Sequence, residues 1–317
     1  MRTDSLSPDP SMSDPSAPHA RVLATPEGTR AFSQEGPRAS PGMLAYVAYP
    51  MFLTACAVAA AYAIAAGLDL ETALMPIFFG IIGVLLVLER LVPFRVGWQP
   101  HTGEIVRDGI YLGQGVVFGG LGQLVAGMLA VLFAVGDNGL PLWLAAPLAI
   151  VLSDLCTYGF HRFVHTNAFM WREHGIHHVT DKVNTLNANT AHFLDILLNN
   201  IAAFGPLLVL GFAPEAVFIA TVARTALNFG AHANIDVRLG WLNHIIMGPE
   251  HHRLHHSVEV ADAGNYATVL TLWDRVFGTF TWAPGRGVAR VGVIGRKSFP
   301  ESHRILASAV HPFVDSR

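Results

Sequence analysis

The sequence predicts an all-α integral membrane protein. Of its 317 residues, 52% are hydrophobic and only 14% are charged, and the mean hydropathy is +0.41. Ordinary soluble domains carry roughly 25% charged residues. Four long apolar segments each provide about the 20 residues that a membrane-spanning helix needs. We therefore expect about four transmembrane helices, a possible further apolar hairpin and a helical cap that carries clustered histidines.

The apolar segments define the order of the elements. We expect membrane-spanning helices at residues 43–68, 74–92, 109–135 and 141–160. Only GDNG, residues 136–139, separates the last two, so they form a tight hairpin. A further apolar stretch at residues 193–231 is broken near Gly211 and carries Arg224. It predicts one more hairpin, which either crosses the membrane or enters it halfway.

The remaining segments complete the predicted domain organisation. The first 42 residues are rich in Pro, Ser and Asp and lack the apolar centre of a secretory signal, which predicts a disordered tail. We expect a disordered N-terminal tail at residues 1–42, followed by transmembrane helices at residues 43–160. A histidine-rich region that includes the apolar hairpin follows at residues 161–282, and a C-terminal tail at residues 283–317.

Charges between the spans predict the orientation. Lysine and arginine lie before the first span, between the second and third, and after the fourth, at Arg30, Arg38, Arg90, Arg95, Arg107, Arg162, Arg172 and Lys182. The two opposite connections contain Asp69, Glu71 and Asp137 but no Lys or Arg. The positive-inside rule therefore places the N-terminus and the histidine-rich region on the cytoplasmic side.

Several other functions find no support. The net charge is −3 and no long block of Lys or Arg occurs, so nothing indicates a nucleic-acid partner. Cys56 and Cys156 lie in apolar runs, which argues against a disulfide framework. The glycine-rich run FGGLGQ, residues 118–123, lacks the third glycine of a dinucleotide loop and indicates close helix packing instead.

Histidine is strongly clustered, because twelve of the sixteen histidines lie between positions 161 and 256. HRFVH places two histidines four residues apart, on one helix face. HGIHH and HRLHH each repeat an i, i+3, i+4 pattern. Each box thus offers two or three imidazoles from one face, and the members are His161 and His165, then His174, His177 and His178, then His252, His255 and His256.

These eight imidazoles predict a metal site. Packed together they would repel one another if protonated and cost desolvation free energy if unpaired, and a cation that takes up their lone pairs resolves both problems. Zinc sites are filled by three or four ligands, so eight histidines fit two ions better than one. Imidazole suits iron, copper, nickel and zinc alike, so the ligands by themselves leave the metal open.

The order and spacing of the boxes resemble those of the fatty acid hydroxylase superfamily, an integral-membrane group that includes sterol desaturases, C-4 methyl sterol oxidases, fatty acid hydroxylases and alkylglycerol monooxygenase. Further similar segments are ERLVP at residues 89–93, Asp154 and Tyr158 before the first box, and LWDRVFGTF at residues 272–280 after Asn265 and Tyr266. Ala267, where relatives usually have Gly, and the missing arginine before TAH at residues 190–192 depart from the pattern and weaken any transfer of substrate identity.

The resemblance implies a bacterial inner-membrane enzyme with a cytoplasm-facing diiron centre, which uses dioxygen to hydroxylate a lipid. No electron-transfer segment of the cytochrome b5, flavin or ferredoxin type is recognisable, so a separate electron-donor protein or a diffusible reductant is implied. The implied iron ligands add His232 in HANID to the eight box histidines, which gives His161, His165, His174, His177, His178, His232, His252, His255 and His256.

Other residues near the boxes receive weaker roles from the resemblance. Asn228, at i−4 from His232, binds metal directly, binds it through water or is structural. His192, followed closely by Asp195, is expected to support a ligand rather than bind metal, and His251 is expected beside the substrate or a ligand. His244 is expected on the polar surface. Asp154 and Asp274 are the carboxylates expected to accept hydrogen bonds from the ligand rings.

Alternative functions differ in the chemistry that they require. Within the superfamily, a lipid desaturase or an ether-lipid monooxygenase fits the same residues. A bis-histidine haem protein for electron transfer would need histidines facing each other inside the spans, and the first four spans contain none before position 161. A metal transporter would need ionisable residues along an intramembrane path, which the spans almost lack.

Overall fold

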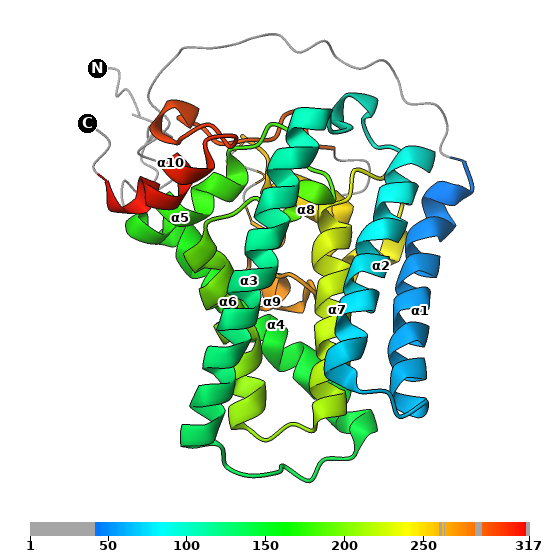
Figure 1. Cartoon of the computed structure of the whole chain (residues 1–317). Coiled ribbons are helices and arrows are strands. Elements are labelled where there is room, and N and C mark those ends of the chain that lie inside the picture. The colour runs from blue at the N-terminus through cyan, green and yellow to red at the C-terminus, as the bar shows by residue number, and fades with distance from the viewer. Residues whose placement is uncertain (1–41, 260–261, 263, 283–286, 315–317) are drawn as a thin grey trace, which may run out of the picture.

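The computed structural model describes residues 42–259, 262, 264–282 and 287–314, and these parts are mostly helical with no named strand. The longest elements form the bundle in Figure 1, and they are α1 (Leu44–Ala65), α2 (Leu70–Leu91), α3 (Thr102–Phe133), α4 (Leu142–Thr166), α6 (Phe193–Val209) and α7 (Pro214–His232). The shorter helices α5 (Ala168–His178), α8 (Pro249–His255) and α10 (Ile305–Val310) lie toward one end of it, and α9 (Leu272–Val276) lies about halfway along it (Figure 1). The tail expected at residues 1–42 lies outside the described residues except for its last residue.

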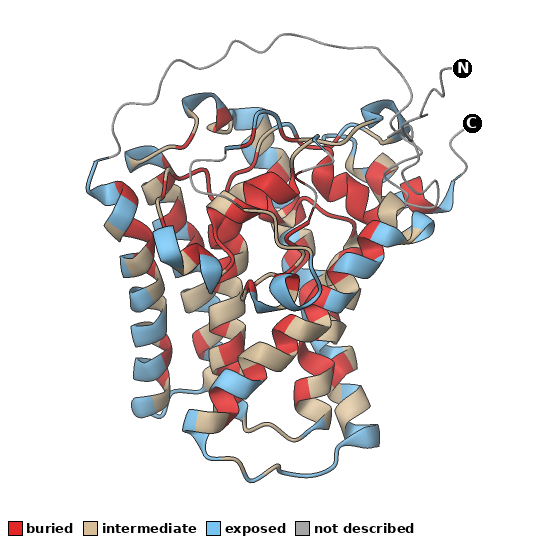
Figure 2. Cartoon of the chain, turned by 180° about the vertical axis from the view of Figure 1, so that it is seen from behind, coloured by how far each residue is buried: buried red, intermediate tan, exposed pale blue. Residues whose placement is uncertain are grey.

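Four of the described helices, α1 to α4, are long and apolar enough to cross a membrane. The expected all-α membrane fold is therefore confirmed. The outer faces of these helices are exposed and apolar, as Val131 of α3 shows with 87% exposure. Figure 2 shows the contrast between these outer faces and the buried residues, which concentrate toward the end of the bundle that carries the short helices.

Polar side chains fix where the helices begin. The Asp69 carboxylate accepts a hydrogen bond from the Thr72 N–H at 2.9 Å and so caps the start of α2. At the start of α3, the His101 ring accepts from the Glu104 N–H while the Glu104 carboxylate accepts from the His101 N–H. This reciprocal capping box uses an isolated histidine that has no part in the histidine boxes.

The apolar stretch at residues 193–231 forms a hairpin of α6 and α7 that runs the depth of the bundle. α3 packs along α6, α4 lies against both arms, and α1 and α2 pack on α7. The hairpin tip reaches the connection between α3 and α4, where the Asn138 N–H donates to the Gly211 carbonyl at 3.1 Å. Gly211 has a φ of +67°, and a Cβ there would lie 1.6 Å from the Gly136 carbonyl oxygen, so only glycine fits.

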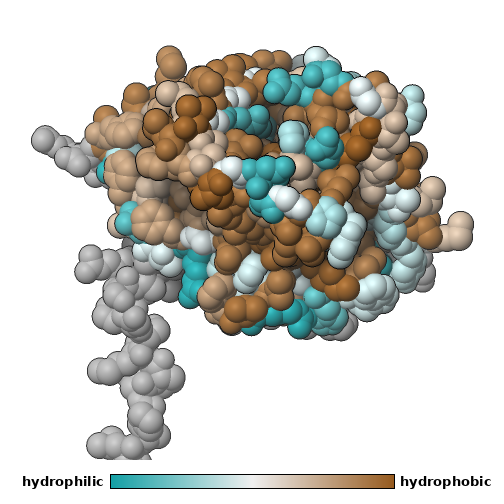
Figure 3. All heavy atoms as spheres, turned by 90° about the horizontal axis from the view of Figure 1, so that it is seen from below, coloured by the Kyte–Doolittle hydropathy of each residue, from teal (hydrophilic) through white to brown (hydrophobic). Residues whose placement is uncertain are grey.

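The two ends of the bundle differ in character. The connections between α1 and α2, between α3 and α4, and between α6 and α7 lie together at the end opposite the short helices (Figure 1). Figure 3 looks onto this end, where hydrophobic atoms surround much of the rim and hydrophilic residues are scattered. At the other end, buried carboxylates join distant segments: Glu89 of α2 accepts hydrogen bonds from the Thr185 N–H at 2.7 Å and the Asn234 N–H at 2.8 Å.

The described part of the segment expected as a C-terminal tail packs onto the histidine-bearing end. Val288 and Val291 join a buried apolar cluster with Phe94, Trp98 and Val183. The aromatic ring of Phe299 lies against Gly175, where an added Cβ would meet the ring at 2.3 Å. This segment therefore covers the helix that carries the second histidine box.

Candidate metal centre

Nine buried histidines from α4, α5, α7 and the α8 segment converge at one end of the bundle. They form two groups, and within each group one ring nitrogen from every member lies within 4.8 Å of the others. The first group contains His161, His165, His174, His178 and His255, and the second contains His177, His232, His252 and His256. These are the nine histidines singled out from the sequence, and either group could hold a metal ion.

Helical spacing explains why two of the boxes serve both groups. On α5, His174 and His178 face the first group, whereas His177, one residue earlier than His178, turns toward the second. On the α8 segment, His255 belongs to the first group and its neighbour His256 to the second. The two groups adjoin, because the ring centroids of His178 and His256 are 4.3 Å apart. The geometry therefore provides two neighbouring centres rather than one.

The hydrogen bonds of the first group leave lone pairs facing each other. His161 donates from Nδ1 to the Tyr266 carbonyl at 2.7 Å, and His174 donates from Nδ1 to the Asp195 carboxylate at 2.9 Å. In the neutral rings both Nε2 atoms are then bare acceptors, yet they lie 3.1 Å apart. A cation about 2.1 Å from each, at roughly a right angle, accounts for a separation of about 3 Å.

The second group shows the same arrangement. His177 donates from Nδ1 to the Thr190 carbonyl at 3.2 Å, and its Nε2 lies 3.0 Å from Nε2 of His232. Nε2 of His256 lies 3.1 Å from Nε2 of His252.

One further ring of the first group shows the same feature. Nδ1 of His255 donates to the Gly264 carbonyl at 2.7 Å, and its buried Nε2 has no hydrogen-bond partner among the described residues. Both donor sets therefore fit a bound cation.

Burial keeps these rings neutral. Desolvation and, to a smaller extent, the neighbouring His174 lower the pKa of His177 to about 4. Desolvation also lowers the pKa values of His178, His252, His255 and His256 well below 6.5, and each is lowered again by the neighbouring imidazoles. Neutral imidazole is the form that binds metal, so the site is ready to bind a cation at neutral pH.

The carboxylate that orients a ligand ring is Asp195, at the start of α6. We expected Asp154 and Asp274 to accept hydrogen bonds from the rings, and this expectation was wrong. Both oxygens of Asp154 accept from the Thr268, Val269 and Leu270 N–H groups, at 2.9 to 3.1 Å. The sequence signal for Asp195 was a single acid in the first turn of an apolar helix, close to His192.

Asp274 acts on the rings only through the backbone. Its carboxylate accepts from the Tyr266 and Ala267 N–H groups, at 2.8 and 3.0 Å, and the Tyr266 carbonyl in turn accepts from His161. In the same way, Asp108 accepts from the Thr190 hydroxyl at 3.1 Å, and the Thr190 carbonyl accepts from His177. Carbonyl groups anchored in this way orient the His161 and His177 rings.

The histidines outside the two groups have other environments. His192 caps α6, accepting from the Leu194 N–H at 3.2 Å and donating to the Ala309 carbonyl at 3.0 Å, so it touches no member of either group through a hydrogen bond. His251 is buried against the rings of Phe280 and Trp282, and burial lowers its pKa to about 3. His244 is exposed, as expected.

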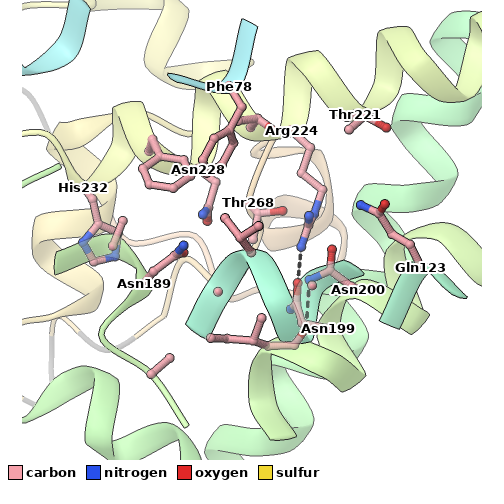
Figure 4. A pocket seen from close by; sticks show the side chains of 18 of the residues that line it. Phe78, Gln123, Asn189, Asn199, Asn200, Thr221, Arg224, Asn228, His232 and Thr268 are labelled. Carbon is pink, nitrogen blue, oxygen red and sulfur yellow. Dashed lines mark hydrogen bonds between the residues drawn. The ribbon is translucent and has the colours of Figure 1, made fainter. Parts of the chain in front are cut away.

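A cavity of about 250 Å³ leads from the histidines into the bundle. Members of both groups line it at one end, namely His161, His174, His177, His232 and His252. Its walls come from α2, α3, α6 and α7, and Asn228 lies on the wall one turn before His232 (Figure 4). Met75 of α2 and Val116 of α3 line the cavity and are 49% and 36% exposed. Lining residues of both helices are therefore also exposed on the apolar outer surface.

Comparison with known proteins agrees with this geometry. Residues 146–279 match the family model for fatty acid hydroxylase, and this range contains all nine histidines. The chain is 28% identical to the ornithine lipid hydroxylase OlsE of Rhizobium tropici over 75% of this chain and 74% of that protein. No solved structure gives a significant match.

Two further relatives cover less of the chain. The alkylglycerol monooxygenase of Homo sapiens is 34% identical over 44% of this chain and 30% of that protein. Methylsterol monooxygenase 1 of Rattus norvegicus is 30% identical over 41% of this chain and 44% of that protein. These relatives are named as monooxygenases or hydroxylases, and the paired histidine groups lie where the family model matches. Residues 146–279 are therefore similar to a fatty acid hydroxylase domain, and the named relatives support an oxidoreductase.

Proposed function

We propose that this protein is a membrane-bound non-haem diiron oxygenase that uses dioxygen to hydroxylate a lipid. The observation that carries the proposal is the pair of adjoining histidine groups, whose facing lone pairs call for two cations. The names of the relatives favour hydroxylation over desaturation. We place the protein in a bacterial inner membrane. The two connections that contain Asp69, Glu71 and Asp137 carry no Lys or Arg, which supports an orientation with the histidine groups on the cytoplasmic side.

In this proposal all nine histidines bind iron, five at the first centre and four at the second. When bound, the two irons supply the redox chemistry that activates dioxygen and oxidises an unreactive carbon. The electrons come from a separate donor protein or a diffusible reductant. Asn228 lies at i−4 from His232, where its amide can reach the second centre directly or through a water molecule.

The chain's own residues would orient the ligands and exclude water. Asp195 and the carbonyl groups of Tyr266, Thr190 and Gly264 hold one nitrogen of four rings as the donor, which directs the other nitrogen to the metal. Apolar side chains such as Phe78, Phe160 and Phe204 line the same cavity as the histidines. They keep the approach to the site dry and hold a hydrocarbon chain near it.

A bis-histidine haem is the alternative from another class. Haem iron takes axial ligands from the protein on the two faces of a flat macrocycle. Here five and four ring nitrogens converge to within 4.8 Å of one another. Such groups have the shape of a small cage around one ion each, which favours the diiron proposal.

Metal and product analysis test the proposal together. Purified protein should contain about two irons per chain and show no Soret band. Lipid extracts from cells with an active gene should contain a species with one added oxygen, which cells with the His255→Ala variant lack. His251→Ala is a matched control, because His251 is a buried neighbour of the ligands on the same helix but belongs to neither group. Loss of iron from both variants alike, or a Soret band in the wild type, would contradict the proposal.

A further inference from the structure

Arg224 is a cation in the interior of the bundle, and no carboxylate among the described residues forms an ion pair with it. It lies on α7, and its guanidinium donates from one terminal nitrogen to the Asn199 side-chain carbonyl. Its buried Nε has no hydrogen-bond partner among the described residues. The charge of Asp154 acts on Arg224, but the oxygens of that carboxylate are already bonded to the N–H groups of residues 268–270.

Neutral polar groups surround the guanidinium where it meets the cavity. Figure 4 shows Arg224 directed toward Asn199, with Gln123 and Asn200 on the same side of the cavity. Thr221 and Thr225 of α7 also line this region. None of these side chains carries a negative charge that could compensate the cation. An unpaired charge at this depth is costly, and its retention indicates a functional contact.

The same cavity joins Arg224 to the histidine groups. Arg224, Asn228 and His232 follow one another at intervals of four residues on α7, and all three line the cavity. Eight residues of helix separate Arg224 from His232, which corresponds to about 12 Å along the axis. A molecule that contacts both residues must therefore be elongated.

We propose that Arg224 binds the anionic group, a carboxylate or a phosphate, of the lipid substrate. This inference rests on the proposed function and specifies the class of lipid. The guanidinium and the amide of Gln123 or Asn200 provide the hydrogen-bond donors that such an anion requires. The carbon that is oxidised is then remote from the charged group, because Arg224 and His232 lie about 12 Å apart along the helix axis.

The test compares the binding of ligands with equal chain length and different head groups. Palmitic acid, hexadecyl phosphate and 1-hexadecanol are titrated against the purified full-length protein at about pH 8, where both acids are ionised. We expect at least one of the anions to bind about tenfold to a hundredfold more tightly than the alcohol. The anion that binds more tightly distinguishes a carboxylate from a phosphate site. Equal affinity for all three ligands would overturn the inference.

Variants assign the preference to Arg224. Arg224→Gln should abolish the preference for the anion and leave the affinity for 1-hexadecanol unchanged. Asn199→Asp places a carboxylate beside Arg224 and should also abolish it, so this variant decides the question if Arg224→Gln does not fold. Arg296→Gln, which removes an exposed ion pair with Glu301, is the control and should keep the preference. An anion preference that survives in folded Arg224→Gln and Asn199→Asp proteins would refute the site.

These measurements separate the two proposals. Ligand affinity is read without any oxidation, so it does not depend on the reaction of the metal centre. If the wild type contains iron and oxidises a lipid but shows no anion preference, the inference about Arg224 fails and the proposed function stands. If the anion preference follows Arg224 but no lipid is oxidised, the binding site stands and the proposed function fails.

Discussion

Asp195→Asn is the substitution that most directly tests how the first metal group is held. Asp195 accepts a hydrogen bond from Nδ1 of His174 at 2.9 Å, and both side chains are buried. The asparagine side-chain oxygen can accept the same bond, so the ring keeps its orientation. Only the negative charge is lost, and with it the charge-assisted part of the bond.

The size of the effect follows from that difference. A hydrogen bond to a charged group contributes about 1.5–3 kcal/mol, whereas one between neutral groups contributes about 0.5–1.5 kcal/mol. The loss of roughly 1–1.5 kcal/mol lowers the affinity of the first group for metal about tenfold. The second group contains neither His174 nor a ring bonded to Asp195, so its affinity should not change.

The assay equilibrates the protein with a graded series of chelator concentrations and then measures the iron per chain by mass spectrometry. This measurement separates the two groups. The variant should pass through a state with about one iron per chain at chelator concentrations where the wild type keeps about two. Asp154→Asn is the control, because that carboxylate binds the backbone of residues 268–270 and no ring. If Asp195→Asn releases both irons together, or holds both as tightly as the wild type, the reasoning is refuted.

Three further predictions follow from the geometry. Gly175→Ala should lower the midpoint of thermal unfolding, because the new Cβ would lie 2.3 Å from the Phe299 ring. Such overpacking costs about 1–3 kcal/mol of folding free energy. A Gly175→Ala/Phe299→Ala double variant that is no more stable than the sum of the two single changes would contradict this reason. Metal-free protein should lose stability as the pH falls from about 6.5 toward 4. In this range His177 binds a proton in the unfolded chain but not in the folded protein, where burial lowers its pKa to about 4. Thermal unfolding measured across this range checks the sign, and constant stability would contradict the prediction. Asp274→Asn should weaken the contact that fixes the Tyr266 carbonyl on His161 and so lower the affinity of the first group for iron about tenfold in the same chelator series. Asp236→Asn, at a partly exposed ion pair with Arg238, should leave this affinity unchanged.

The sequence by itself determined the membrane fold and the eight histidines of the three boxes, whereas His232 was added from the family resemblance. Long apolar segments can satisfy their backbone hydrogen bonds in a membrane only as helices, so composition and length sufficed for α1 to α4. The i, i+3, i+4 spacing within the boxes placed imidazoles on common helix faces before any tertiary contact was known. Both signals are local in the chain, and local signals survive in a sequence read alone.

Only the tertiary structure decided how the histidines divide and what holds them. His177 and His178 are neighbours in the chain but belong to different groups, because the direction of each ring depends on how α5 packs against α4, α7 and α8. The ring partners Asp195, Thr190 and Tyr266 come from three separate segments. Spacing along one helix carries no information about contacts between helices, which is why Asp154 was assigned to the rings although it anchors a loop. The depth of the α6–α7 hairpin and the position of Arg224 in the cavity likewise depend on packing across the whole bundle.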